Sequence, residues 1–305
     1  MFTDSFNSLS AALPEKTVLF NAPLKNLTTM KVGGNATCLV EATDESVIRT
    51  VINFTKQENI PLLVIGNGSN MVISDLGFPG VVLHISKGMA HIHCDGTRII
   101  AQAGALLPAV SRLAADNSLT GLEFASGIPG SVGGAVVMNA GAYGGEMSHV
   151  LEFVTILADA EVKTIPVDEL AFSYRHSIFM DHPDWIILSA AFKLHKDDQA
   201  QIIAQMNDLS ARRREKQPLQ YPSSGSFFKR PEGHFAGALI EQSGLKGFSI
   251  GGAQVSALHA GFVINTGNAT ASDVYQLMLH VQKTVMERFH VSLLPEVRLI
   301  GQFEV

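Results

Sequence analysis

Glycine is concentrated in one passage of this chain, residues 122–146, which read LEFASGIPGSVGGAVVMNAGAYGGE. Glycine allows backbone conformations that other residues avoid, and it lets a backbone approach a ligand closely. Residues 127–135 (GIPGSVGGA) follow an apolar segment that we expect to be a strand, an arrangement that suits a backbone wrapped around a flat ligand or a pyrophosphate. A glycine-rich turn between two strands is the alternative.

A second glycine loop, GNGSN at 66–70, follows PLLVIG (61–66), which is typical of a buried strand. Consecutive N–H groups in such a loop can bind an anion. The loop is not a Rossmann fingerprint, because Met71 occupies the place of the third glycine, and no Gly-Lys-Ser/Thr follows as in a P-loop. Alone it is equally consistent with a tight turn. Together with residues 122–146 it predicts an extended nucleotide cofactor.

Composition restricts the class of protein. The 305 residues are 46% hydrophobic and 16% charged, which is typical of a globular chain with two or three lobes. A net charge of −6 without a basic segment argues against a nucleic-acid partner. Two cysteines, Cys38 and Cys94, fit a reducing cytosol. Without a signal-peptide pattern or a long apolar run, we expect a soluble cytoplasmic protein with no membrane partner.

Hydrophobic spacing predicts a mixture of helices and strands, and therefore an α+β fold. We expect helices at 44–58, 106–118, 199–216 and 271–290, strands at 61–66, 71–74, 81–86, 151–157 and 186–194, a turn at 75–80, and a hairpin about Asp95-Gly96. The helix at 271–290 has the clearest apolar stripe.

Three further segments carry polar groups of interest. HIHC at 91–94 suggests zinc ligands, but on a strand Cys94 points away from the two histidines and no second cluster exists, so we expect no metal site. The isolated arginine of SYRHS (173–177) is of the kind that ordinarily lies at the surface, and ARRREK (211–216) is expected to be partly a solvated face and partly a phosphate contact.

The stretch YPSSGSFFKRPEG (221–233) predicts a hydroxyl, that of Ser226, at the tip of a glycine-flanked turn. Phe227 and Phe228 would anchor the far side of that turn by apolar packing. The local sequence is not G-x-S-x-G, so a hydrolase nucleophile is not expected.

Taken in order, several motifs resemble the UDP-N-acetylenolpyruvoylglucosamine reductase family, in its shorter structural type. They are TTMKVGG (28–34), GNGSN (66–70), GIPGSVGGA and MNAGAYGGE (127–146), SYRHS (173–177), GSFFKRP (225–231) and PEVRLIG (295–301). The resemblance spans residues from about 23 to 301. The glycine loops alone would indicate only the wider group of FAD-binding domains with this fold.

The resemblance implies an FAD-binding domain of the PCMH or vanillyl-alcohol-oxidase type and a smaller α+β substrate-binding domain. We place the first at 1–198, with lobes at about 1–82 and 83–198, and the second at 199–305. Residues 297–305 are candidates to pack back on the first lobe.

The implied activity is the NADPH-dependent reduction of UDP-N-acetylglucosamine enolpyruvate to UDP-N-acetylmuramate, for peptidoglycan precursor synthesis and hence the cell wall. Hydride would reach the substrate through FAD, held non-covalently because GNGSN contains no His or Cys. Ser226 matches the family's proton donor, Arg175 the residue that stabilises the substrate carboxylate and the intermediate, and Glu296 the third catalytic residue.

The resemblance also implies binding residues. Those for FAD are Gly66, Asn67, Gly68, Ser69, Asn70, Ser126, Gly127, Ile128, Pro129, Gly130, Ser131, Gly133, Gly134, Ala140, Gly141, Arg213 and Arg298. Those for the substrate are Tyr174, Lys216, Lys229, Arg230 and His259.

The chain departs from the family pattern at two positions. Leu258 stands where relatives often have Lys, and Arg230 stands where some have Asn. Two other functions fit parts of the sequence. A flavin oxidase of an alcohol or sugar would keep the glycine loops but leave GSFFKRP and PEVRLIG without a purpose. A nucleotide-sugar-binding protein without redox chemistry would use the loops for UDP.

Overall fold

The structure, a computed structural model, describes residues 2–303. The chain divides into two compact units. Unit 1 comprises Met1–Leu19, Cys38–Asn67 and Gly80–Arg213, and unit 2 comprises Phe20–Thr37, Gly68–Pro79 and Arg214–Val305. The domain division expected from the sequence, at residue 198, stays a prediction.

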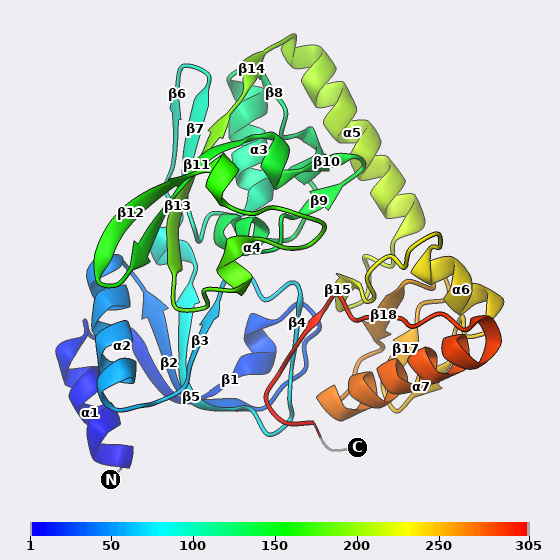
Figure 1. Ribbon diagram of the computed structural model, residues 1–305, viewed down its shortest axis with the longest axis horizontal. Coiled ribbons are helices and arrows are strands. Elements are labelled where there is room, and N and C mark those ends of the chain that lie inside the picture. Colours follow the sequence, from blue (N-terminus) through cyan, green and yellow to red (C-terminus); the bar gives the residue numbers. More distant parts are fainter. Residues whose placement is uncertain (1, 304–305) are drawn as a thin grey trace. The chain divides into compact units, whose positions relative to one another are not determined.

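Two sheets organise unit 1 (Figure 1). The larger is antiparallel, in the order β12-β11-β13-β7-β6, with β6 Ile92–Asp95, β7 Arg98–Gln102, β11 Leu151–Ala158, β12 Glu161–Pro166 and β13 Ile186–Lys193. The other has the order β1-β2-β5-β3, with β1 Val18–Pro23, β2 Asn35–Ala42, β3 Leu62–Ile65 and β5 Phe78–Ile85; its residues 20–23, 35–37 and 78–79 are assigned to unit 2. Asp95 pairs with Arg98, which confirms the predicted hairpin.

Helix α2 (Glu45–Gln57) begins where the sequence predicts it. The Asp44 carboxylate accepts hydrogen bonds from the N–H groups of Ser46 and Val47, and so satisfies two of the four unpaired donors at the helix start. Its apolar face is buried, and α1 (Phe2–Ala12) packs against it with the Phe6 and Phe54 rings 6.0 Å apart.

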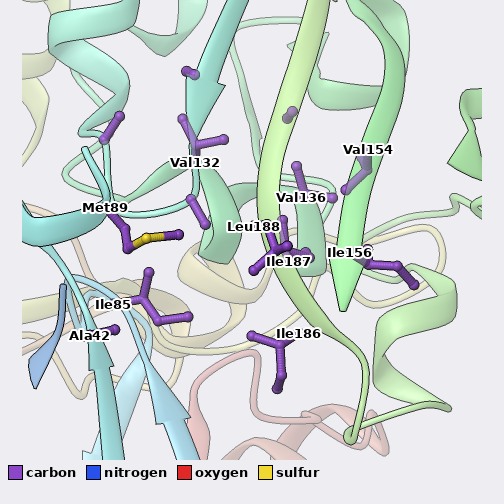
Figure 2. Close-up of a cluster of buried hydrophobic side chains, with 14 of the residues drawn as sticks. Ala42, Ile85, Met89, Val132, Val136, Val154, Ile156, Ile186, Ile187 and Leu188 are labelled. Carbon is purple, nitrogen blue, oxygen red and sulfur yellow. The ribbon is translucent and has the colours of Figure 1, made fainter. Parts of the chain in front are cut away.

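One continuous hydrophobic core joins the two sheets of unit 1. Figure 2 shows Ile85, from the end of β5, in the same cluster as Val132 and Val136 of α4 (Val132–Val137) and Leu188 of β13. The remaining α-helices and strands of this unit are α3 Leu107–Asp116, the short strands β8 Leu119–Thr120, β9 Gly141–Ala142, β10 Gly145–Glu146 and β14 His195–Lys196, and most of α5 Gln199–Lys216.

Unit 2 is built on an antiparallel sheet in the order β15-β18-β17-β16. Its strands are β15 Ser223–Ser226, β16 Ser249–Ile250, β17 Ala253–Val255 and β18 Phe262–Asn265. Figure 1 shows α7 (Ala271–Phe289) lying along this sheet beside β17, with α6 (Ala236–Gln242) next to it. The predicted apolar stripe of α7 is confirmed for Val274, Leu277, Met278, Val281 and Val285, which are buried, whereas its last member, Phe289, is only partly buried.

The C-terminal strand of unit 2 pairs with a segment from early in the chain. Strand β19 (Arg298–Ile300) runs parallel to β4 (Met71–Ile73) and is joined to it residue by residue. This pairing places the residues after GNGSN beside the end of PEVRLIG. Within residues 2–303, no helix combines the length and apolar content needed to cross a bilayer.

Three local expectations were wrong. Residues 223–226 form a strand, so Ser226 ends β15 and does not sit at a turn tip; a register shift between Ser223 and Ser226, with Gly225 at φ 74°, bends the strand instead. The segment before GIPGSVGGA is a 3₁₀ helix (Glu123–Ala125) rather than a strand. Strand β5 starts at Phe78, inside the expected turn.

Candidate active site

Within unit 1, Gly66 and Asn67 of the first glycine loop contact the second loop. A Cβ added to Gly66 would lie 2.1 Å from Ser131 Oγ, so the backbone of the first loop lies directly against a side chain of the second. Asn67 Nδ2 also donates to Pro129 O at 2.7 Å. The structure therefore brings together parts of GNGSN and GIPGSVGGA, and the two residues joined by this hydrogen bond are 62 positions apart in the sequence.

The loop at 126–134 is held by backbone hydrogen bonds to the segment before α3. The bonds are Leu107 N–H to Gly130 O at 3.0 Å, Val132 N–H to Ala105 O at 2.8 Å and Gly133 N–H to Ala103 O at 2.8 Å. A Cβ on Gly133 would lie 3.1 Å from the Ala103 side chain, so glycine lets α4 begin close to β7. These hydrogen bonds therefore hold the loop in one conformation, and its glycines allow a ligand to approach the backbone closely.

Arg213 of α5 lies on the same loop. A Cβ added to Gly127 would lie 3.1 Å from both Nε and Nη1 of Arg213, so the guanidinium rests against this glycine. Among the described residues, Glu123 Oε1 is buried and lacks a hydrogen-bond partner, while Oε2 accepts from Gly121 N–H at 2.9 Å. Close-lying glycine backbone and an arginine together fit a pyrophosphate-containing group such as FAD.

Arg175 lies at the tip of a tight turn in unit 1. Ser173 and His176 exchange backbone hydrogen bonds of 3.2 Å, and Arg175 has φ 56°, a left-handed conformation that is strained for any residue except glycine. Its Nη2 donates to Gly141 O at 3.1 Å, and its Cζ lies 5.1 Å from the centre of the Tyr174 ring. The predicted residues Tyr174, Arg175 and Gly141 are therefore neighbours.

In unit 2, GSFFKRP and PEVRLIG are paired through their backbones. Glu296 N–H donates to Phe227 O at 2.9 Å, Phe228 and Pro295 form an isolated bridge, and Lys229 N–H donates to Leu294 O at 2.8 Å. Phe227 and Phe228 are 0% and 4% exposed, so they fix this pairing, whereas Ser226 next to them is exposed. An exposed hydroxyl on a rigid, apolar-anchored strand is well placed to act on a bound substrate.

The end of the first glycine loop joins the same arrangement. Asn70 Nδ2 donates to Glu296 O at 3.1 Å, and Arg298 N–H donates to Asn70 O at 3.0 Å. Gly68 has φ 55°, and its carbonyl accepts from Thr29 N–H at 3.2 Å. Arg298 is exposed, but partial desolvation of its guanidinium lowers its pKa below the ordinary arginine value; it stays charged at neutral pH.

The predicted substrate residues of unit 2 have defined surroundings. His259 Nδ1 accepts from Gly261 N–H at 3.1 Å, and burial lowers its pKa, which favours the neutral ring at pH 7. Arg230 stacks over the Phe235 ring with Cζ 4.0 Å from the centroid. Lys216 is exposed at the C-terminal end of α5.

The expected catalytic trio is divided between the units. Ser226 and Glu296 belong to unit 2, where Glu296 N–H donates to the carbonyl of Phe227, the residue after Ser226, and Arg175 belongs to unit 1. Sequence reasoning missed Asn139, which donates to Ser173 O in the Arg175 turn, and Glu146, which accepts from Asn139, although both lie within the quoted passage MNAGAYGGE. From that passage, the sequence predicted only small residues, Ala140 and Gly141, as site residues. In residues 2–303, no three His, Cys, Asp or Glu side chains gather as a metal site requires.

Comparison with known families identifies the class of protein. Residues 36–165 match the family described as FAD binding domain, so unit 1 and its glycine loops define a flavoprotein oxidoreductase. Residues 217–300 match the C-terminal domain of UDP-N-acetylenolpyruvoylglucosamine reductase. The chain belongs to the UDP-N-acetylenolpyruvoylglucosamine reductase family, as its motifs predict. Its predicted fold class, an FAD-binding domain followed by a smaller α+β domain, is confirmed.

Individual relatives resemble the chain over nearly its whole length. The UDP-N-acetylenolpyruvoylglucosamine reductase of Agathobacter rectalis is 50% identical over 97% of this chain and 98% of its own. That of Listeria innocua is 48% identical over 97% and 99%. The crystal structure of the Thermus caldophilus reductase matches with a TM-score of 0.78 and 34% identity, over 93% of this chain and 98% of that one.

A more distant similarity concerns the fold alone. Phl p 4.0202, a glucose dehydrogenase, matches with a TM-score of 0.51 at 14% identity, over 64% of this chain and 44% of its own. This match is consistent with an FAD-binding fold that serves several chemistries.

Proposed function

We propose that this protein reduces the enolpyruvyl group of UDP-N-acetylglucosamine enolpyruvate, with NADPH as the electron source, to give UDP-N-acetylmuramate for peptidoglycan synthesis. The observation that carries the proposal is the Glu296 N–H to Phe227 O hydrogen bond of 2.9 Å, because it joins the two motifs that are specific to the family. Family membership over 97% of the chain supports the same reaction.

FAD, when bound, supplies the hydride that it has received from NADPH. The residues that fit it are those of the 66–70 and 126–134 loops, with Ala140, Gly141 and Arg213 beside them. Arg298 is a further residue proposed for FAD, and it belongs to unit 2. Since GNGSN has no His or Cys, binding is non-covalent.

Ser226 is the proposed proton donor. When hydride adds to the carbon β to a carboxylate, negative charge develops on an enolate-like intermediate, which is basic enough to take a proton from a serine hydroxyl. The exposure of Ser226 gives the substrate access to it, and the fully buried Phe227 keeps its backbone in place.

Arg175 is proposed to bind the substrate carboxylate and to stabilise the developing charge. A planar guanidinium can bind a carboxylate through two parallel hydrogen bonds, and fixed positive charge is typically the largest catalytic contribution at such a centre. Glu296 is proposed to orient the intermediate or to assist delivery of the proton.

The nucleotide part of the substrate carries a diphosphate. Lys216, Lys229 and Arg230 supply positive charge for it, and the neutral His259 supplies a ring nitrogen. Tyr174 is proposed to contact the substrate next to Arg175. We place the protein in the cytoplasm, with NADPH and the nucleotide sugar as partners and neither nucleic acid nor membrane among them.

Visible spectroscopy under anaerobic conditions tests the proposal. Flavin absorbance should bleach with NADPH and return when UDP-N-acetylglucosamine enolpyruvate is added. Reoxidation by oxygen alone would instead indicate an oxidase, and a protein that binds no flavin even after reconstitution with FAD would exclude redox chemistry.

The Ser226→Ala variant tests the proton donor. It should still bind FAD and be reduced by NADPH, but turn over the substrate about 10²- to 10⁴-fold more slowly, the usual cost of removing a general acid. Ser223→Ala, on the same strand, is the matched control. Near-normal turnover of Ser226→Ala would remove this residue from the mechanism.

A further inference from the structure

The Arg175 turn is fixed to the end of the glycine passage by a row of hydrogen bonds, all within unit 1. We call segments 137–141 and 173–177 together the arginine clamp. Its bonds are Ser177 Oγ to Val137 O at 2.7 Å, Asn139 Nδ2 to Ser173 O at 3.1 Å and Arg175 Nη2 to Gly141 O at 3.1 Å. The clamp therefore holds the turn at both ends and at its tip.

Asn139 is the central member of the clamp. It is 0% exposed, and its φ of 41° is a left-handed conformation that asparagine adopts more readily than most non-glycine residues. Its amide nitrogen donates to Ser173 O and to Glu146 Oε1, both at 3.1 Å, while Oδ1 accepts from Ser148 N–H at 3.0 Å. A buried amide with its donors and acceptor satisfied makes a rigid, specific connection.

Glu146 completes the connection as an anion. Its Oε1 accepts from the Ser148 hydroxyl at 2.6 Å in addition to Asn139. These two hydrogen bonds, that of Ser148 the larger contribution, lower the pKa of Glu146, and the charge of Arg175 adds to the effect. The carboxylate is therefore ionised at neutral pH and needs the Asn139 donor opposite it.

We propose that Asn139 is a positioning residue for Arg175: it holds the Ser173–His176 turn so that the guanidinium keeps the orientation that the substrate carboxylate requires. The inference deepens the proposed function and rests on it, because it acts through the role of Arg175. Its physical basis is that a strained turn on the surface keeps one conformation only when neighbouring groups over-determine it, and that small errors of orientation slow a reaction strongly.

Asn139→Asp tests the inference, since it keeps the size of the side chain but removes both donors and places a second carboxylate against Glu146. Rates are measured per bound flavin in the two half-reactions, by stopped-flow absorbance. We expect flavin reoxidation by UDP-N-acetylglucosamine enolpyruvate to slow about tenfold, and reduction by NADPH to stay within about twofold of wild type.

A double-mutant cycle separates positioning from general damage. In an Arg175→Ala background, Asn139→Asp should change reoxidation by less than about twofold, because the two residues act as one unit. Adding Glu146→Gln to Asn139→Asp should restore part of the rate, because the amide that this second substitution introduces can donate to the new carboxylate. Glu152→Gln, which breaks the Arg98 ion pair elsewhere in unit 1, is the matched control and should leave both half-reactions unchanged.

The inference is overturned if the flavin of the Asn139→Asp variant is reoxidised by the substrate as fast as that of wild type. It is also overturned if Asn139→Asp slows this reoxidation by the same factor of about ten in the Arg175→Ala background. If the aspartate variant does not bind flavin, Ser177→Ala removes one clamp bond without adding charge, and normal reoxidation of that variant would overturn the inference equally. Failure of the proposed function gives a different result. The reduced flavin of the wild-type protein would then not be reoxidised by UDP-N-acetylglucosamine enolpyruvate, and the inference would be refuted together with the proposed function.

Discussion

Replacing Gly68 by alanine measures how closely the first glycine loop must approach its neighbours. Gly68 has φ 55°, and an added Cβ would lie 2.0 Å from Leu27 O and 3.0 Å from Thr28 Cα, all within unit 2. Both contacts are backbone atoms, which cannot rotate away as a side chain could. The left-handed conformation costs alanine about 1 kcal/mol, and forcing a methyl group into a packed site costs about 1–3 kcal/mol more. We therefore expect the free energy of unfolding to fall by about 2–4 kcal/mol.

Equilibrium urea unfolding, followed by circular dichroism, is the assay. Gly244→Ala is the matched control, because Gly244 lies in the same unit with φ 76° and no atom within 4 Å of its added Cβ. That variant should lose only the conformational part, about 1 kcal/mol. Since residues 66–70 are proposed to hold FAD, Gly68→Ala should also retain less flavin after gel filtration. Equal destabilisation by the two variants would refute the close-approach argument.

Three further changes have defined outcomes. Phe227→Ala should lower the free energy of unfolding by about 3–5 kcal/mol, because it empties a position that is 0% exposed; a urea midpoint close to wild type would contradict this. Thr270→Ala removes one half of the capping box with Asp273 at the start of α7 and should cost about 1 kcal/mol in a urea titration. Hydrogen bonds from Ser46 and then Val47 lower the pKa of Asp44, so its stabilising effect is present at neutral pH and is lost as the pH falls below about 4. Asp44→Asn should match wild type at pH 7 and lack that acid-induced loss, and identical pH profiles would show that Asp44 does not contribute.

Local elements were predictable wherever one short-range pattern decides the structure. The cap at Asp44, the hairpin at Asp95-Gly96 and the stripe of α7 each depend on residues within a few turns of one another. The wrong predictions fall where a distant partner decides. The composition of Ser223–Ser226 predicts a turn, but this segment forms a strand because β18 supplies its hydrogen-bond partners.

The candidate site divides in the same way. Ser226, Arg175 and Glu296 were selected because family motifs surround them, and the neighbouring glycines were visible in the sequence. Asn139 was not selected, because its importance depends on Ser173, Glu146 and Ser148 being brought to it. A single buried amide has no sequence signature of its own.

The sequence by itself indicated the family, through the resemblance of its motifs, and the cofactor class. It also predicted several of the longer helices and strands, since hydrophobic period is a local property of the chain. Only the tertiary structure decided that Gly66 lies against Ser131, that Phe227 is hydrogen-bonded to Glu296, and that Asn139 reaches the Arg175 turn. The physical reason is that these contacts form between segments far apart in the chain, whose meeting depends on the packing of the whole core rather than on any local preference.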